Sequence, residues 1–151
     1  GGKKNLYQEV LNAQAVVFFK LIDDIRHMNM SPLTKLRHYV DALSKIQETN
    51  PESIPLICRE LLAPQPIFEK FVKNKLYALH QFMTELVEQA IECKEIHTDI
   101  KPTHVAFTIE STIMFFFLTQ HQVQELGNYA PGEQGIYLTQ VLETYLASLS
   151  K

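Results

Sequence analysis

Apolar residues recur at three- and four-residue steps along most of the chain, the spacing that places them on one face of an α-helix. No segment of the sequence shows the two-residue alternation typical of a half-buried strand. The pattern therefore predicts an all-α helical bundle of five to six helices joined by short loops. We expect helices over about 4–28, 32–48, 53–62, 67–93, 102–126 and 133–149.

Serine, proline and glycine mark the expected boundaries of these helices. Ser31 is placed to cap the second helix, because its hydroxyl can accept a hydrogen bond from a backbone N–H, and Pro32 suits the first helical position. Pro51 and Pro64 interrupt the helices that precede them. The segment 127–132, GNYAPG, is typical of a loop. We find no internal repeat and expect one domain.

Two of the predicted helices are apolar on more than one side. The first carries two apolar stripes, one formed by Leu11, Ala15, Phe18, Ile22 and Ile25 and the other by Leu6, Val10, Val17 and Leu21. The fifth contains the run 109–118, IESTIMFFFL. A helix apolar on several sides is normally covered on several sides. The fifth helix is therefore either the centre of one globule or a helix shared between its own core and that of a partner.

The last predicted helix, over 133–149, also carries more apolar positions than a one-sided surface helix needs. We expect it to form a hairpin with the fifth helix and to pack against a second copy of that hairpin, as in a twofold homodimer. The alternative is that both faces are used inside one protomer. The residues expected at the dimer interface are Phe115, Leu118, Gln122, Leu138, Val141, Leu142, Tyr145 and Leu149.

Composition narrows the classes of protein that need to be considered. The formal net charge of −3 argues against a chain that wraps nucleic acid through a basic face. Cys58 and Cys93 have no metal-type spacing and suggest free thiols of an intracellular protein. We see no signal peptide and no membrane-spanning run of about 20 apolar residues. A cytoplasmic protein that makes no membrane contact is therefore expected.

The sequence contains no recognisable catalytic set. It has no G-x-S-x-G, H-E-x-x-H or phosphate-binding glycine-rich motif. A di-iron bundle needs Glu-x-x-His on its inward faces, and no glutamate here has a histidine three residues later. His97 and His104 flank Asp99, but we interpret them as exposed histidines rather than metal ligands. We expect no enzyme activity, no cofactor and no metal.

Glu110 is the polar residue that most suggests a binding site. It shares a helix face with Phe107, Met114, Phe117 and His121. A carboxylate on such a face must be paired, protonated or next to a wet cavity. It is an acid that binds a ligand, a structural partner of His121, His80 or Arg59, or a residue on an outward-facing turn of the helix.

Aromatic and methionine side chains on the helices that must face one another suggest an adaptable apolar cavity, although a plain packed core would show the same periodicity. We place the cavity between the first, fourth and fifth helices. Its expected lining is Phe18, Ile22, Phe71, Met83, Phe107, Met114 and Phe117, with Glu110 and His121 as polar groups.

The first residues resemble a known signature. Lys3, Leu6 and Tyr7 match the tail of F-x-x-K-x-x-L-Y, which in TetR-family transcriptional regulators follows the DNA-recognition helix; the leading Phe would lie before Gly1. The segment 56–66, LICRELLAPQP, resembles an arginine-glutamate-leucine stretch of that family, and 90–106 resembles the segment that enters its penultimate helix. The resemblance therefore extends along the chain.

The resemblance implies an Ω-shaped homodimer held by its last two helices, with a pocket for a small-molecule effector in each body. The effector would change the spacing of two DNA-binding heads through the first helix. We expect the helix-turn-helix head to lie outside this sequence, with 1–151 as the ligand-binding and dimerisation domain and 1–7 as the remnant of its junction to the head. The protein would contact DNA only through that head, with Lys3 near a DNA phosphate.

In this interpretation the chain is the regulatory body of a repressor that binds an apolar or aromatic effector. The competing interpretation is a helical protein–protein interaction module that binds no small molecule.

Overall fold

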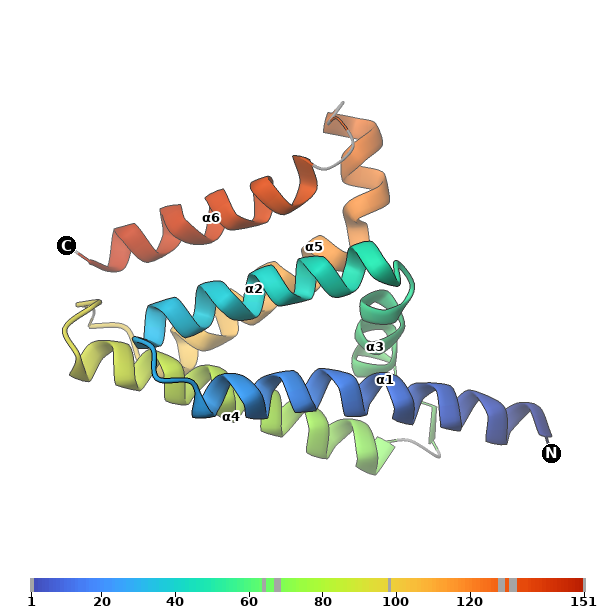
Figure 1. Cartoon of the computed structure of the whole chain (residues 1–151). Helices are drawn as coiled ribbons and strands as arrows, with labels where there is room; N and C mark the ends of the chain where they lie inside the picture. Colours follow the sequence, from blue (N-terminus) through green and yellow to red (C-terminus); the bar gives the residue numbers. More distant parts are fainter. Residues whose placement is uncertain are drawn as a thin grey trace.

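The computed structural model describes residues 2–63, 65–66, 69–97, 99–127, 130 and 133–150, without the side chains of 71, 123 and 134. Over this part the chain is all-α and contains no strand, as predicted (Figure 1). Its helices are α1 (Gly2–His27), α2 (Pro32–Thr49), α3 (Ser53–Leu62), α4 (Glu69–Glu92), α5 (Pro102–Gly127) and α6 (Glu133–Leu149).

Local sequence signals place the helix ends well. The Ser31 hydroxyl accepts a hydrogen bond from the backbone N–H of Thr34 at 3.4 Å, and Pro32 opens α2. α5 begins at Pro102 and α6 at Glu133, both as predicted. The predicted start of α4 at Ile67 lies outside the described residues. The boundaries follow from capping and proline chemistry, which act within a few residues of each helix end.

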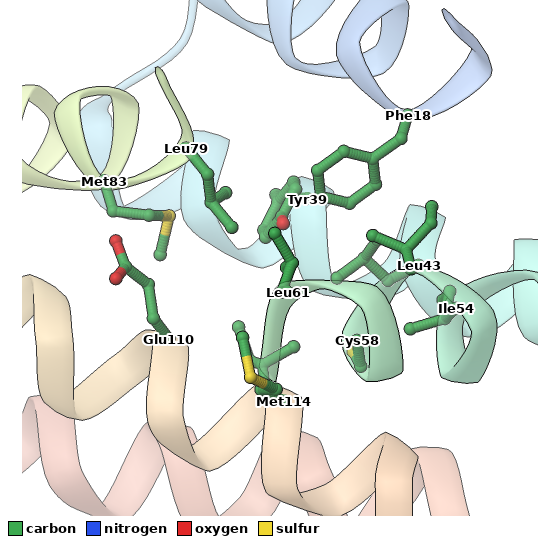
Figure 2. A pocket seen from close by; sticks show the side chains of 12 residues that line it. Phe18, Tyr39, Leu43, Ile54, Cys58, Leu61, Leu79, Met83, Glu110 and Met114 are labelled. Carbon is green, nitrogen blue, oxygen red and sulfur yellow. The ribbon is translucent and has the colours of Figure 1, made fainter. Parts of the chain in front are cut away.

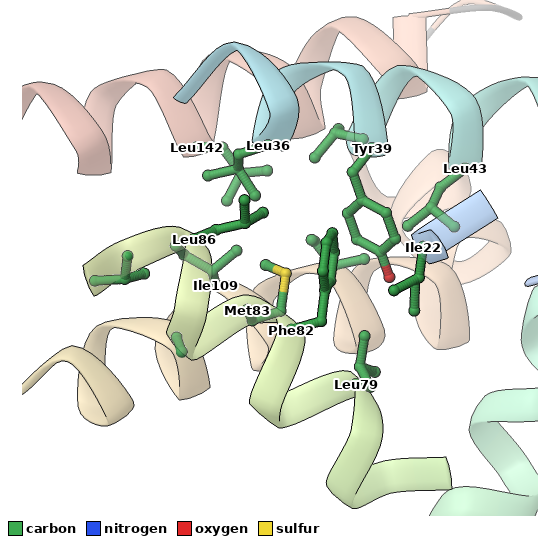
Figure 3. Packing of buried hydrophobic residues seen from close by; sticks show 14 of the residues in the cluster. Ile22, Leu36, Tyr39, Leu43, Leu79, Phe82, Met83, Leu86, Ile109 and Leu142 are labelled. Atoms are coloured by element: carbon green, nitrogen blue, oxygen red, sulfur yellow. The ribbon is translucent and has the colours of Figure 1, made fainter. Parts of the chain in front are cut away.

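α4 and α5 form the centre of the bundle. α4 packs along α5 and also against α2, while α1 contacts α2 and α3, and α6 contacts α5 and α2. In Figure 1, α2 lies between α6 and α1 in the view. The main core joins residues from all six helices, and its fully buried side chains include Ile25, Leu43, Phe82, Ile109 and Leu138. Figure 3 shows Phe82 and Met83 of α4 packed among side chains of α1, α2 and α5.

Only one of the two apolar stripes of α1 is buried. Leu11, Ala15, Phe18, Ile22 and Ile25 form the buried stripe. Leu6, Val10 and Val17 are exposed, and Leu21 is half-buried. A smaller cluster around Leu11 and Val72 holds the first half of α1 against α3 and α4. The N-terminal half of α1 is therefore held by fewer apolar contacts than its C-terminal half.

Three residues of the predicted dimer interface are buried within the protomer. Leu138, Leu142 and Leu149 are buried in the core of their own protomer, so they have no surface to offer a partner. The side of α6 on which they lie is covered by α2 and α5. Phe115 is 68% exposed and Gln122 is exposed, while Leu118, Val141 and Tyr145 are half-buried.

α5 and α6 contact each other through an aromatic pair. The rings of Phe116 and Tyr137 are stacked, with centroids 5.9 Å apart. Figure 1 shows the last turns of α5 standing close to the start of α6. The hairpin expected from the sequence is therefore formed within one protomer. None of the helices in the described ranges is long and apolar enough to cross a membrane.

Phe82→Ala should lower the free energy of unfolding by about 3–5 kcal/mol, because it deletes a ring with no exposed surface and leaves a void beside Tyr39 of α2 and Arg26 of α1. Tyr77→Ala is the matched control, since Tyr77 lies on the same helix and is 70% exposed. It should change stability by less than about 0.5 kcal/mol. Urea unfolding followed by circular dichroism at one protein concentration measures the free energy of unfolding of both variants. Similar decreases in the two variants would contradict the central position of Phe82 in the core.

Candidate functional site

A cavity lies where α1, α2, α3, α4 and α5 meet (Figure 2). Its volume is ≈ 30 Å³, enough for about two water molecules. An organic ligand therefore needs the walls to move. The wall residues are Phe18, Tyr39, Leu43, Ile54, Ile57, Cys58, Leu61, Leu79, Met83, Glu110, Ile113 and Met114.

A second cavity of ≈ 30 Å³ adjoins the first between α1, α3 and α4. The residues that line both cavities, and so separate them, are Phe18, Ile57, Leu61 and Leu79. At the second cavity the ammonium of Lys75 lies 4.5 Å from the centre of the Phe19 ring. Rotation of the shared side chains would join the two spaces into one elongated apolar site.

Glu110 is the acid in the wall of the first cavity, and it is only 9% exposed. The Nδ1 atom of His80 lies 3.2 and 3.1 Å from its two carboxylate oxygens. The Nε2 atom of His80 lies 2.8 Å from the Thr103 hydroxyl. A neutral imidazole protonated on Nδ1 satisfies both contacts, because Nδ1–H donates to the carboxylate and Nε2 accepts from the hydroxyl.

Burial raises the pKa of Glu110, and the hydrogen bond from His80 opposes that shift. His80, one of the partners considered for a structural pair, is therefore in contact with Glu110. The carboxylate nevertheless remains part of the cavity wall. Figure 2 shows it beside Met83 and above Met114.

The other polar groups of the first cavity are unsuited to catalysis. Burial raises the pKa of the Cys58 thiol to about 12, so at neutral pH it is protonated and a poor nucleophile. The Tyr39 hydroxyl also has a raised pKa, chiefly because of burial. The wall otherwise consists of hydrocarbon and thioether groups. Such a cavity can bind an apolar molecule, which is what ligand sites of this composition usually do.

The structure brings four of the predicted pocket residues together. Phe18, Met83, Glu110 and Met114 line the first cavity. Their role in ligand binding stays a prediction. Ile22 and Phe117 are buried in the core rather than in the walls of either cavity described above. Phe71 lies in α4, but its side chain is outside the described residues.

Two predicted pocket residues point elsewhere. Phe107 is 65% exposed, and His121 is exposed. The buried side of α5 is centred on Ile109, Ile113 and Phe116, and Glu110 lies at the edge of that side. Phe107 and His121 therefore lie outside the walls of the two cavities described above, and their part in ligand binding stays a prediction.

Sequence reasoning missed the walls contributed by α2 and α3. These residues are Tyr39, Leu43, Ile54, Ile57, Cys58 and Leu61. The apolar face of α2 was visible as periodicity, but it matched an ordinary core face. The short helix α3 contacts both α1 and α5, an arrangement that no local signal in 53–62 indicates.

Two side-chain hydrogen bonds join α1 to α3. The Tyr7 hydroxyl donates to the buried carboxylate of Glu60, and the Ser53 hydroxyl donates to the amide oxygen of Gln14. Burial and the Glu60 carboxylate raise the pKa of Tyr7 to about 12. Since the inner side of α3 lines both cavities, these bonds connect the cavity wall to the first half of α1.

Comparison with known families finds a match along most of the chain. Residues 16–144 match a TetR C-terminal family described as "YcdC-like protein, C-terminal region". No curated protein matches the chain. The matched range contains every wall residue of the first cavity and parts of all six helices.

The stability of the protein should depend on pH through Glu110. Its pKa is raised in the folded state, so between the ordinary glutamate pKa and the raised value the folded chain binds more protons than the unfolded chain. The free energy of unfolding that Glu110 contributes therefore falls as pH rises through this window. In Glu110→Gln this component should disappear, and the stability difference between wild type and variant should shrink or reverse as pH rises towards neutral.

The measurement is urea unfolding of both proteins across that pH range, with Glu88→Gln as the control for an exposed acid on α4. The groups that face Glu110 are His80 from α4, Tyr39 from α2 and Cys58 from α3. A repeat in a His80→Gln background separates the contribution of the histidine. If the free energy of unfolding depends on pH in the same way for wild type and Glu110→Gln, the pKa of Glu110 is not raised.

Proposed function

The chain belongs to the TetR family of transcriptional regulators, as a C-terminal region of the YcdC-like type, and we propose that it is the regulatory body of a ligand-responsive repressor. In this proposal the body binds a small apolar or aromatic effector in the cavity between α1 and α5. It forms a homodimer and acts on DNA only through an N-terminal helix-turn-helix head. The match over 16–144 confirms the predicted family, while Lys3, Leu6 and Tyr7 lie before the matched range.

The observation that carries the proposal is the apolar cavity and its contact with α1. Phe18 of α1 forms part of both cavities, and the same helix is hydrogen-bonded to α3. Because each cavity measures only ≈ 30 Å³, an effector must push walls apart as it enters. Met83 and Met114 are flexible enough to adapt, and further space requires α1 or α3 to shift.

A shift of α1 is the step that would regulate DNA binding. Two heads on a dimer must reach half-sites about one helical turn of DNA apart. An effector that binds one position of α1 more tightly than the other changes the populations of the two states. We propose that Leu6 and Tyr7, at the start of α1, pass this change to the head. Lys3 is exposed in the first turn, and its contact with DNA phosphate remains a prediction.

The exposed sides of α5 and α6 support the proposed dimer. Phe115, Leu118 and Gln122 lie on one face of α5 at three- and four-residue steps, and Val141 and Tyr145 lie on one face of α6. An exposed apolar ring such as Phe115 is typical of an interaction surface when apolar neighbours surround it. We propose that these residues pair with their copies around a twofold axis, in place of the buried leucines.

Uncharged aromatic compounds, beginning with 1-methylnaphthalene, should raise the melting temperature of the chain at micromolar protein concentration. Ile57→Trp should abolish this shift, because Ile57 lines both cavities and the larger side chain fills them. Val16→Trp is the control, since Val16 is exposed on α1. If no apolar compound binds, or if Ile57→Trp binds as wild type does, the helical interaction module becomes the better interpretation.

Phe115→Asp should weaken dimerisation by at least about 30-fold, which corresponds to the 2 kcal/mol or more of an interface hot spot. Sedimentation equilibrium measures this, with circular dichroism to show that the helices remain. Val16→Asp, an exposed change on α1, should leave the dimer intact. Leu142→Asp should instead unfold the protomer, because Leu142 is part of its core. A wild-type chain that is monomeric at micromolar concentration would exclude the proposed dimer.

A further inference from the structure

We propose, on the basis of the function above, that the effector carries a hydrogen-bond-donating group, as an alcohol, phenol, amide or ammonium does, which binds between Glu110 and Tyr39. Anionic molecules are excluded from the same cavity. The apolar part of the effector fills the space between the two methionines and the residues shared with the second cavity.

Two oxygen-bearing side chains face an otherwise apolar space. Tyr39 is 2% exposed and Glu110 is 9% exposed, and they come from different helices, α2 and α5. Figure 2 shows the Tyr39 hydroxyl and the Glu110 carboxylate among the labelled apolar side chains of the cavity. The remaining polar atom of the wall is the Cys58 sulfur, a weak hydrogen-bonding group.

Both oxygen groups have hydrogen-bonding capacity left in the structure. Two carboxylate oxygens offer about four lone-pair positions, and the described contact to Glu110 is the single Nδ1 of His80. The Tyr39 hydroxyl makes no hydrogen bond with any residue that the structure describes. Each of the two groups can therefore bond to a molecule inside the cavity without giving up a described hydrogen bond.

The chemistry of that partner follows from the two groups. A carboxylate accepts hydrogen bonds, so the partner must donate one to Glu110. The Tyr39 hydroxyl can donate or accept, and it therefore suits either the oxygen of an alcohol or a second N–H of an amine or amide. His80 is hydrogen-bonded to both Glu110 and Thr103, and these bonds fix the orientation of the Glu110 carboxylate.

Charge explains why anions are excluded. None of the residues that line the first cavity is Lys, Arg or His. An anionic group would lose its hydration there and lie close to the carboxylate of Glu110, with no cation in the wall to compensate. Lys75 belongs to the second cavity, where its ammonium lies over the Phe19 ring.

A matched series of probes tests the proposal: 1-methylnaphthalene, 1-naphthylmethanol, 1-naphthylmethylamine and 1-naphthoate, titrated by calorimetry at neutral pH. The alcohol and the amine should bind at least tenfold more tightly than the hydrocarbon, and the carboxylate more weakly than any of them. Glu110→Gln should reduce the affinity for the amine at least tenfold and leave that for the hydrocarbon unchanged. Glu88→Gln is the control.

Tyr39→Phe adds a readout that a structural role would not produce. The hydroxyl that it deletes makes no hydrogen bond with the described residues, so the melting temperature of the free protein should stay the same or rise. The affinities for the alcohol and the amine should nevertheless fall severalfold. Tyr77→Phe, an exposed change on α4, should alter neither property.

The outcomes separate this inference from the proposed function. If 1-naphthoate binds as tightly as the amine, or if Glu110→Gln preserves the preference for the amine, the inference is wrong while hydrocarbon binding still supports an effector site. If none of the four probes binds, the proposed function itself fails. The ratio of amine to carboxylate affinity in the wild type needs no variant, so the test holds even if a substitution prevents folding.

Discussion

The packing of α4 against α5 is the contact on which the other parts of the structure depend. Ile109 of α5 is completely buried and lies with Met83 and Val87 of α4 along this contact, and α2 and α6 complete the core around it. The same contact holds His80 against Glu110, so a hydrogen-bonded polar pair lies at the edge of the largest apolar cluster. Burying a carboxylate is unfavourable unless a partner compensates, and α4 supplies that partner.

This arrangement leaves a small cavity on the side of the core where α3 closes the bundle. A tightly packed interior resists the entry of a ligand, because each wall residue already contacts its neighbours. The wall residues that can change conformation most easily are the two methionines and the four side chains that separate the first cavity from the second. The α4–α5 contact can therefore stay fixed while α1 and α3 respond.

The proposed connection from the cavity to DNA binding runs through α1. Its C-terminal half is part of the main core, whereas its N-terminal half is held by a small apolar cluster and by the hydrogen bonds of Tyr7 and Gln14. A helix anchored firmly at one end and lightly at the other can move its free end for little energy. In the proposed function, that end is the one nearest the DNA-binding head.

The sequence by itself determined the class of the fold and the ends of its helices, because these depend on interactions within a few residues. Ser31 and Pro32 start α2 through local hydrogen bonding and a restricted backbone, wherever that helix lies in the bundle. The opening signature and the overall order of helices were likewise sufficient to indicate the family that the match over 16–144 establishes.

The tertiary structure alone decided which face of each helix is covered. α1 showed two apolar stripes in sequence, and only the stripe with Phe18 and Ile22 is buried. Of three consecutive phenylalanines on α5, Phe115 is exposed while the next two are buried. Periodicity states which residues share a face, but burial depends on helices that arrive from distant segments. For the same reason, Tyr39 and Cys58 became cavity walls only when α2 and α3 folded against α5.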